Sequence, residues 1–147
     1  AFALLPGEEQ NILAAAEVGL GVLSTSRREW VWKIEGGAPI SACIADTARG
    51  EAVIGGADGF IAAFALADGR PVRRLRVGAP VVGLAALPSV RVLTVATRRG
   101  ILALDEAWRM RGFYPLAAQR LARLGEQSVL AVRDDGALEA LTFDEGV

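Results

Sequence analysis

The sequence predicts an all-β protein built from about four similar antiparallel sheets. Three observations indicate this: similar segments recur at intervals of about 40 residues, short apolar runs alternate with turn residues, and Asp-Gly pairs stand between those runs. The chain has 147 residues, of which 52% are hydrophobic and 22% are charged. This composition is typical of a folded globular chain and not of a disordered or fibrous one.

An internal repeat is the main evidence for this architecture. The segment Gly37-Ala38-Pro39-Ile40 returns 41 residues later as Gly78-Ala79-Pro80-Val81. Each proline is followed 20 residues later by a turn glycine, and a third copy begins at Pro115. The turn glycines of the four successive units are Gly19, Gly59, Gly100 and Gly136. Such a series predicts a structural unit of about 40 residues that occurs four times.

Each unit shows the pattern of four consecutive strands. In the second unit, the expected strands are 40–45, 52–56, 60–66 and 72–77. The third unit repeats them as 81–87, 90–97, 101–104 and 109–114. Asp-Gly between two apolar runs, as at Asp58-Gly59, favours a hairpin because glycine adopts positive φ without penalty. We therefore expect the chain to divide into units at 1–36, 37–77, 78–114 and 115–147.

The segment 116–124 leaves a helix open as an alternative to a strand. Alanine favours helices, and Ala117, Leu121 and Leu124 follow a helical spacing behind Pro115, which suits a first helical turn. The repeat, however, places the same residues in the first strand of the fourth unit. Small residues suit such a strand at the crowded centre of the array, so we predict a strand.

The second unit resembles the PQQ-like, or quinoprotein-type, β-propeller repeat, a relative of WD40-like repeats. The resemblance is carried by 65–73 (Ala-Leu-Ala-Asp-Gly-Arg-Pro-Val-Arg) with the following 78–81, and 102–105 (Leu-Ala-Leu-Asp) echoes it. That family ends its third strand in A-L-D-x-x-T-G-K and places a tryptophan in the fourth strand. Trp32 stands at this place in the first unit, and Arg73 replaces the tryptophan in the second. The resemblance implies blades of a ring of eight or a similar number, often a non-catalytic scaffold and sometimes a quinone-dependent dehydrogenase.

The predicted fold is therefore a β-propeller-like array of about four four-stranded antiparallel blades, the last of them incomplete. Residues 1–5 already form the first strand of the first unit, and the sequence stops at Val147, after the third strand of the fourth. A tight four-bladed ring is one interpretation. A piece of a larger ring, or a half-ring completed by a second copy or another protein, is favoured because an open arc exposes two blade faces.

The sequence lacks the residues that several chemistries need. It contains no histidine, which excludes Ser-His and Cys-His nucleophiles, and Cys43 is its single cysteine. We expect Cys43 to be a buried packing thiol and predict no catalytic, cofactor-binding or metal-binding residue and no cofactor. The longest nearly uncharged stretch, 12–26, is too short to cross a bilayer. No signal-peptide pattern is recognisable at the start of the sequence. The sequence leaves the compartment undetermined, with a cytoplasmic protein slightly favoured.

The net charge of −1 conceals an uneven distribution of charge. Residues 1–69 contain 4 basic and 9 acidic side chains, residues 70–123 contain 11 and 2, and residues 124–147 contain 1 and 6. The basic segment suits an acidic protein surface or a phosphate backbone. Alternatively, its arginines protect outer edge strands and pair with nearby acidic residues. The second interpretation is favoured, because the exposed aromatic residues that accompany nucleic-acid binding are few here.

The candidate interaction patch combines arginines of this segment with two tryptophans. Its members are Arg73, Arg74, Arg76, Arg98, Arg99, Arg109, Arg111, Trp30 and Trp32. Trp30 and Trp32 are two residues apart and are expected to share one strand face, either between blades or as a recognition patch.

The predicted function is a non-catalytic scaffold for protein–protein interaction. Its partner would be another protein or a second copy of the chain that completes the ring. One alternative is a part of a quinoprotein-like dehydrogenase. The other is a module that binds nucleic acid or phosphate through the basic third blade.

Overall fold

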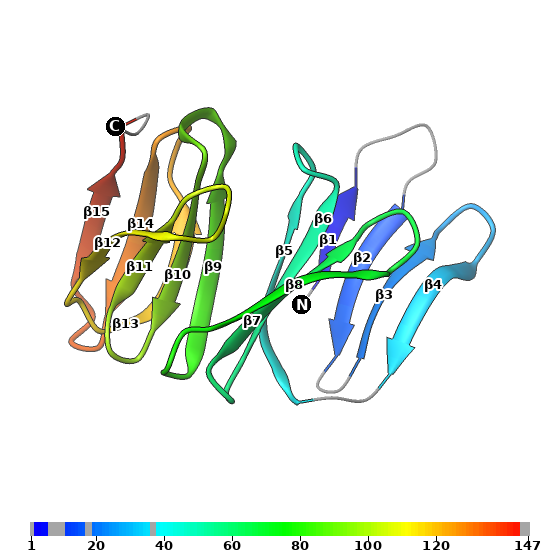
Figure 1. Cartoon of the computed structure of the whole chain (residues 1–147), viewed down its shortest axis with the longest axis horizontal. Helices are drawn as coiled ribbons and strands as arrows, with labels where there is room; N and C mark the ends of the chain where they lie inside the picture. The colour runs from blue at the N-terminus through cyan, green and yellow to red at the C-terminus, as the bar shows by residue number, and fades with distance from the viewer. Residues whose placement is uncertain (1, 6–10, 17–18, 36–37, 145–147) are drawn as a thin grey trace.

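The computed structural model describes residues 2–5, 11–16, 19–35 and 38–144, which form four antiparallel sheets (Figure 1). Three sheets have four strands each, and the fourth has three within the described residues. The one helical element described is a 3-10 turn, η1 (Pro88–Val90). No helix in the described ranges is long and apolar enough to cross a membrane.

In every sheet the strands lie side by side in the order of the chain. Sheet 1 comprises β1 (Phe2–Leu5), β2 (Asn11–Ala16), β3 (Gly19–Ser24) and β4 (Glu29–Glu35). Sheet 2 comprises β5 (Ile40–Asp46), β6 (Glu51–Gly56), β7 (Phe60–Ala65) and β8 (Pro71–Arg76). Sheet 3 comprises β9 (Val81–Leu87), β10 (Val92–Thr97), β11 (Ile101–Leu104) and β12 (Met110–Tyr114). Sheet 4 comprises β13 (Ala118–Arg123), β14 (Ser128–Arg133) and β15 (Leu138–Thr142).

The all-β prediction is confirmed, and so is a strand in the segment where a helix was the alternative. Ala118–Arg123 forms β13 and pairs with β14. One predicted strand start is wrong. Val90 lies in η1, and the strand begins at Val92 because Arg91 takes a left-handed conformation with φ 57°.

Consecutive sheets meet through their first strands. β1 contacts β5, β5 contacts β9, and β9 contacts β13. An apolar core fills each space between neighbouring sheets, and the third strands contribute to all of these cores. Leu20, Ile61 and Ile101 occupy one register position on the third strands of sheets 1 to 3, with exposures of 4%, 0% and 0%. Each of them packs in a cluster with residues of the following sheet. The repeat therefore sets the same sheet-to-sheet contact three times.

The turn glycines serve two different purposes. Gly59 and Gly136 have φ of 84° and 85°, where a residue with a Cβ is strained, so the Asp-Gly hairpin prediction holds there. Gly100 has no such φ. A Cβ at this position would lie 2.5 Å from the Phe113 ring and from the Tyr114 carbonyl, so glycine is needed there for close approach of β12.

Candidate functional site

The fourth strand of each complete sheet sends one long side chain toward the next sheet. In sheet 1 this is Trp32, whose Nε1 donates a hydrogen bond to the Leu66 carbonyl over 2.7 Å. Its ring covers Gly69, which has φ 76° and where a Cβ would lie 2.5 Å from Cε3 of the ring. We call this contact, made by Trp32, Leu66 and Gly69, the tryptophan joint.

Arg73 makes the corresponding contact between sheets 2 and 3. Its Nη1 donates to the Glu106 carbonyl over 2.9 Å, and its Nη2 reaches both carboxylate oxygens of Glu51 at 2.7 and 2.8 Å. The guanidinium carbon lies 4.9 Å from the centre of the Trp108 ring. We call this contact, made by Arg73, Glu51, Glu106 and Trp108, the arginine joint. The Arg73 side chain is only 22% exposed, so Arg73 is not part of an exposed interaction patch.

A third contact of this kind joins sheets 3 and 4. Arg111 on β12 donates to the Val90 carbonyl over 3.5 Å and to the Asp144 carbonyl over 3.1 Å. Val90 lies within sheet 3 itself, so Arg111 reaches sheet 4 only through the Asp144 carbonyl. Of the nine residues in the predicted patch, Trp32, Arg73 and Arg111 bond to the backbone of a neighbouring sheet, and Arg111 does so while exposed.

The prediction that Trp30 and Trp32 share one strand face is wrong. Val22 pairs with Trp32 and Leu23 pairs with Trp30, so a β-bulge at Val31 inserts one extra residue between the tryptophans. The bulge turns the two rings to opposite faces of sheet 1. Trp30 lies over Gly21 on the outer face and is 45% exposed, whereas Trp32 faces sheet 2.

Four of the predicted arginines remain open to solvent. Arg76, Arg98, Arg99 and Arg109 are exposed, and their side chains form no ion pair with any residue that the structure describes. Two other arginines of the basic segment do pair with nearby acidic residues, as the alternative interpretation predicted. Arg70 lies 3.9 Å from Asp68, and Arg91 lies 3.6 Å from Glu106.

Strand β12 carries two exposed apolar side chains close in sequence to Arg109. Met110 is 64% exposed and Phe113 is 47% exposed. They pair with Leu104 and Leu102, which are two residues apart on β11, so both side chains leave the same face of sheet 3. Sequence reasoning missed them, although apolar residues between arginines in an expected outer strand were a usable signal.

We call this region the β12 surface. It comprises Arg98, Arg99, Arg109, Met110 and Phe113. The Phe113 ring lies over Gly100, which directly follows Arg99, so the turn before β11 and the outer strand β12 meet here.

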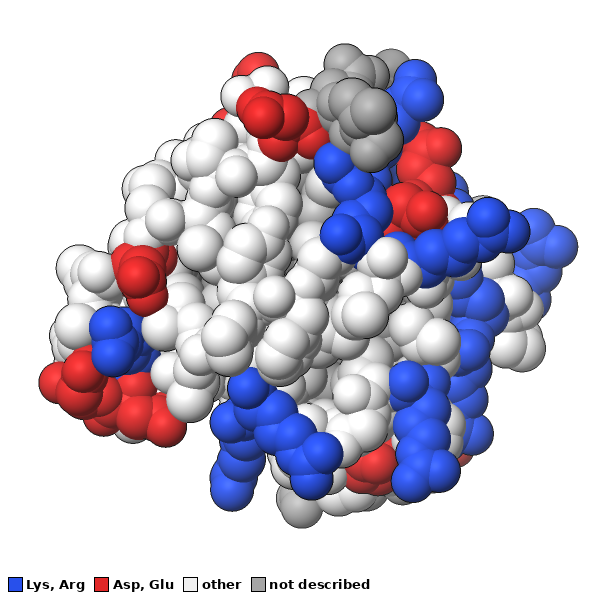
Figure 2. Space-filling view, turned by 60° about the vertical axis from the view of Figure 1, so that its left-hand side comes forward, with Lys and Arg blue, Asp and Glu red and all other residues white. Residues whose placement is uncertain are grey.

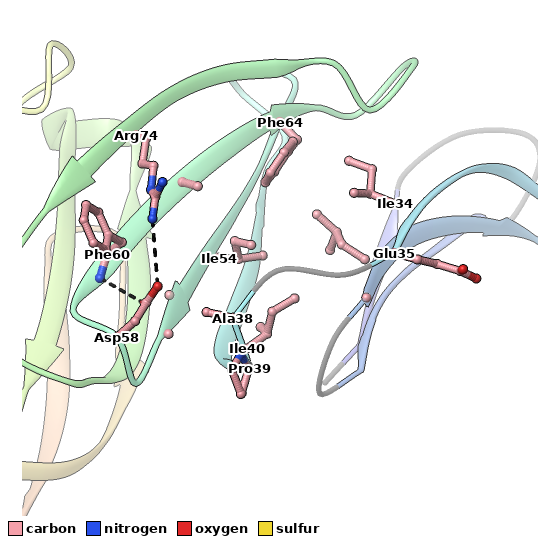
Figure 3. Close-up of a pocket in the computed structure, with 15 residues that line it drawn as sticks. Ile34, Glu35, Ala38, Pro39, Ile40, Ile54, Asp58, Phe60, Phe64 and Arg74 are labelled. Atoms are coloured by element: carbon pink, nitrogen blue, oxygen red, sulfur yellow. Dashed lines mark hydrogen bonds and ion pairs between the residues drawn. The ribbon is translucent and has the colours of Figure 1, made fainter.

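A cleft of about 340 Å³ lies between sheets 1 and 2 (Figure 3). Ile34, Ile54 and Phe64 give it apolar walls. Its polar groups are already partnered: Arg74 lies 3.9 Å from Asp58 and 3.9 Å from the centre of the Phe60 ring. This lining suits a small apolar group and supplies neither a nucleophile nor a free acid–base pair.

A smaller cavity of about 130 Å³ lies beside the arginine joint. Asp46 lines this cavity, and its Oδ1 is buried without a hydrogen-bond partner among the described residues. Arg73 Nε, in the joint beside it, is likewise buried without one. Burial raises the pKa of Asp46, against the opposing effect of Arg49. Polar atoms beside this cavity therefore form a hydrogen-bond network that is incompletely satisfied.

The most reactive side chains that the structure describes are not arranged for catalysis. Burial raises the pKa of Cys43 to about 11, so its thiol stays protonated near neutral pH and is a poor nucleophile. Its side chain packs against the core between sheets 1 and 2. Among the described residues, no three His, Cys, Asp or Glu side chains are grouped to hold a metal ion.

Neither a protein-family model nor a curated protein matches this sequence.

Proposed function

We propose that the protein is a non-catalytic, propeller-like scaffold that binds an acidic protein surface through the β12 surface. Three features support the propeller-like arrangement. The first strands of consecutive sheets lie next to each other, each pair of sheets encloses its own core, and Trp32 and Arg73 make equivalent contacts at successive boundaries. Repeats that contact only their neighbours commonly present extended binding surfaces.

The observation that carries the binding proposal is the exposure of Met110 and Phe113 among unpaired arginines. Aromatic residues, methionine and arginine are enriched where proteins bind one another. A partner would remove the two apolar side chains from water and supply carboxylates to Arg98, Arg99 and Arg109. Both gains are available only if the partner is apolar at its centre and acidic around it.

A protein partner is favoured over a nucleic acid by the kind of apolar side chain present. Binding of single strands usually relies on several aromatic platforms on which successive bases stack. The β12 surface offers one exposed aromatic ring, Phe113, and a methionine that cannot serve as such a platform. Nucleic acid is therefore the competing outcome in the test.

Two probes and two variants test the proposal. The probes are a fluorescent peptide of alternating glutamate and leucine and a single-stranded DNA oligonucleotide, followed by anisotropy at several salt concentrations. The variants are Arg98→Glu with Arg99→Glu, and Met110→Ser with Phe113→Ser. Arg70→Glu is the control, since Arg70 already lies beside Asp68 outside this surface.

We expect the peptide to bind and each double variant to weaken it about tenfold, because central interface residues commonly contribute more than 1 kcal/mol each. The control should bind as the parent chain does. Tighter binding of DNA that depends on the arginines but not on Met110 and Phe113 would replace the protein partner with a nucleic acid. No binding of either probe at low salt would refute the β12 surface as a binding site.

A further inference from the structure

The outer face of sheet 4 carries an apolar surface that no described residue covers. Leu138 is 66% exposed and Ala140 is exposed, and Leu130 and Val132 on the neighbouring strand are half-buried. Leu138 pairs with Val132 and Ala140 pairs with Leu130, so the four side chains share one face. The opposite face of this sheet packs against sheet 3 through Val129 and Ala131.

The same register positions are buried in every other sheet. Leu138 corresponds to Leu20, Ile61 and Ile101, whose exposures are 4%, 0% and 0%. Ala140 corresponds to Val22, Ala63 and Ala103, whose exposures are 2%, 0% and 2%. In sheets 1 to 3 these positions are covered by the following sheet. The outer face of sheet 4 therefore has the form of an inter-sheet contact that lacks its second half.

A matching face lies at the other end of the array, on sheet 1. Ala14, Ala16, Gly19 and Gly21 border an open hollow of about 550 Å³, and Trp30 with the paired Lys33 and Glu35 lies at its edge. In sheet 2, the positions that correspond to Ala14 and Gly19 are Ile54 and Phe60. At these two positions, small residues on sheet 1 leave room where sheet 2 carries large ones.

We propose that the outer face of sheet 4 docks into this hollow on sheet 1 of a second copy of the chain. Leucine and valine side chains protrude from one face, and alanine and glycine recede from the other. The contact continues the one that sheets 1 to 4 make inside a single chain, from each sheet to the next. A second copy supplies both faces, so the association is head-to-tail and closes into a ring or extends as a filament.

This inference rests on the blade-like repetition in the proposed function but not on the β12 surface. Figure 2, which brings forward the side of the molecule where β15 lies, shows a broad surface without charged side chains. The uncharged face of sheet 4 suits a contact between identical chains, which share the same net charge of −1, and the charges beside the hollow on sheet 1 already neutralise each other as the Lys33–Glu35 pair.

The test is the mass in solution, measured by light scattering and sedimentation at tens of micromolar and above. The chain has a mass of 15.4 kDa, and we expect at least twice that value. Leu138→Glu and Ala16→Glu each place a charge in one of the two faces, and both should give single chains. Val72→Glu on β8 is the control; Val72 is 44% exposed away from both faces, so assembly should persist.

Mixing the two charged variants distinguishes head-to-tail docking from other modes. Each variant retains the face that the other has lost, so an equimolar mixture should form a species of two chains. Circular dichroism establishes that the variants are folded, and Leu138→Ser replaces Leu138→Glu if the charge unfolds the chain.

A parent chain that stays single at all concentrations would overturn the proposal. So would an Ala16→Glu variant that still assembles, because sheet 4 would then pair with itself or with another surface. The glutamate–leucine peptide is titrated separately against single-chain Leu138→Glu. Loss of assembly with unchanged peptide binding would leave the β12 proposal intact.

Discussion

The tryptophan joint and the arginine joint solve the same packing problem with opposite chemistry. Trp32 pairs with Val22 and Arg73 pairs with Ala63, so the two side chains start from equivalent register positions. Each donates a hydrogen bond to the backbone carbonyl that follows the third strand of the next sheet. The position is thus defined by its reach and its donor group and not by its aromatic character.

The two joints differ in which side supplies the aromatic ring. In the tryptophan joint the ring is on the fourth strand and glycine lies in the facing turn. In the arginine joint the ring of Trp108 is in the turn, at φ 62°, and the fourth strand provides the guanidinium. A cation placed there must be neutralised, and the 8% exposed carboxylate of Glu51 does this. A joint built on a charged side chain therefore requires a second residue of opposite charge, whereas the joint built on tryptophan does not.

Removing Glu51 should have the largest effect on stability. Glu51→Ala leaves the Arg73 guanidinium partly buried without its carboxylate, which typically costs about 3–5 kcal/mol. We expect a value near the lower end, because Arg73 is 22% exposed and retains its bond to Glu106. Urea unfolding followed by tryptophan fluorescence measures the loss.

Two further variants separate the charge from the contact. Glu29→Ala breaks the exposed pair with Arg27 and should cost below about 1 kcal/mol. Glu51→Met combined with Arg73→Met should recover most of the stability lost by Glu51→Ala, because apolar residues can replace a buried pair. If Glu51→Ala were no worse than Glu29→Ala, the ion pair would not hold the arginine joint.

The repeat allowed much of the fold to be predicted, but it predicted few of the contacts in the tryptophan and arginine joints. Spacing and turn residues are local properties, so the strand at Ala118–Arg123 and the Asp-Gly turn at Gly59 could be found from the sequence. The alignment of Trp32 with Arg73 was also visible. The sequence could not show that Arg73 is neutralised by Glu51, because that pair depends on a contact across two strands of one sheet.

The faces of Trp30 and Trp32 were misjudged for a related reason. Strand periodicity assumes a regular ladder, and the bulge at Val31 breaks it without a glycine or proline to mark the place. The exposure of Met110 and Phe113 could not be predicted for a similar reason. In the sequence they look like ordinary strand residues, and only the packing of the sheets shows that they are uncovered.

In the tryptophan joint, Gly69→Ala should cause an intermediate loss of stability. A Cβ at φ 76° is strained by about 1–2 kcal/mol, and it would also lie 2.5 Å from the Trp32 ring. The matched control is Gly78→Ala, because Gly78 has φ 79° and no atom within 4 Å of the added Cβ. We expect Gly69→Ala to exceed this control by at least about 1 kcal/mol in urea unfolding. Equal losses would mean that the ring moves aside freely and that the tryptophan joint is loose.

The smallest effect should come from Asp46, and it should have a sign opposite to the others. Burial raises the pKa of this carboxyl, so the folded chain binds its proton more tightly than the unfolded chain does. The stability that Asp46 contributes is therefore present below the ordinary pKa of 3.8 and is lost as the pH rises through the raised value. Asp46→Asn removes that loss and keeps the size of the side chain.

At neutral pH, Asp46→Asn should be slightly more stable than the parent chain. We expect the gain to be small, because the side chain is partly open to solvent. The gain should vanish toward pH 3.5, where the parent carboxyl is also protonated. Thermal unfolding of both chains between pH 3.5 and 7 measures the difference. A variant less stable at neutral pH would show instead that the carboxylate is held by the neighbouring Arg49 and Arg73, and that the polar cavity strengthens the arginine joint.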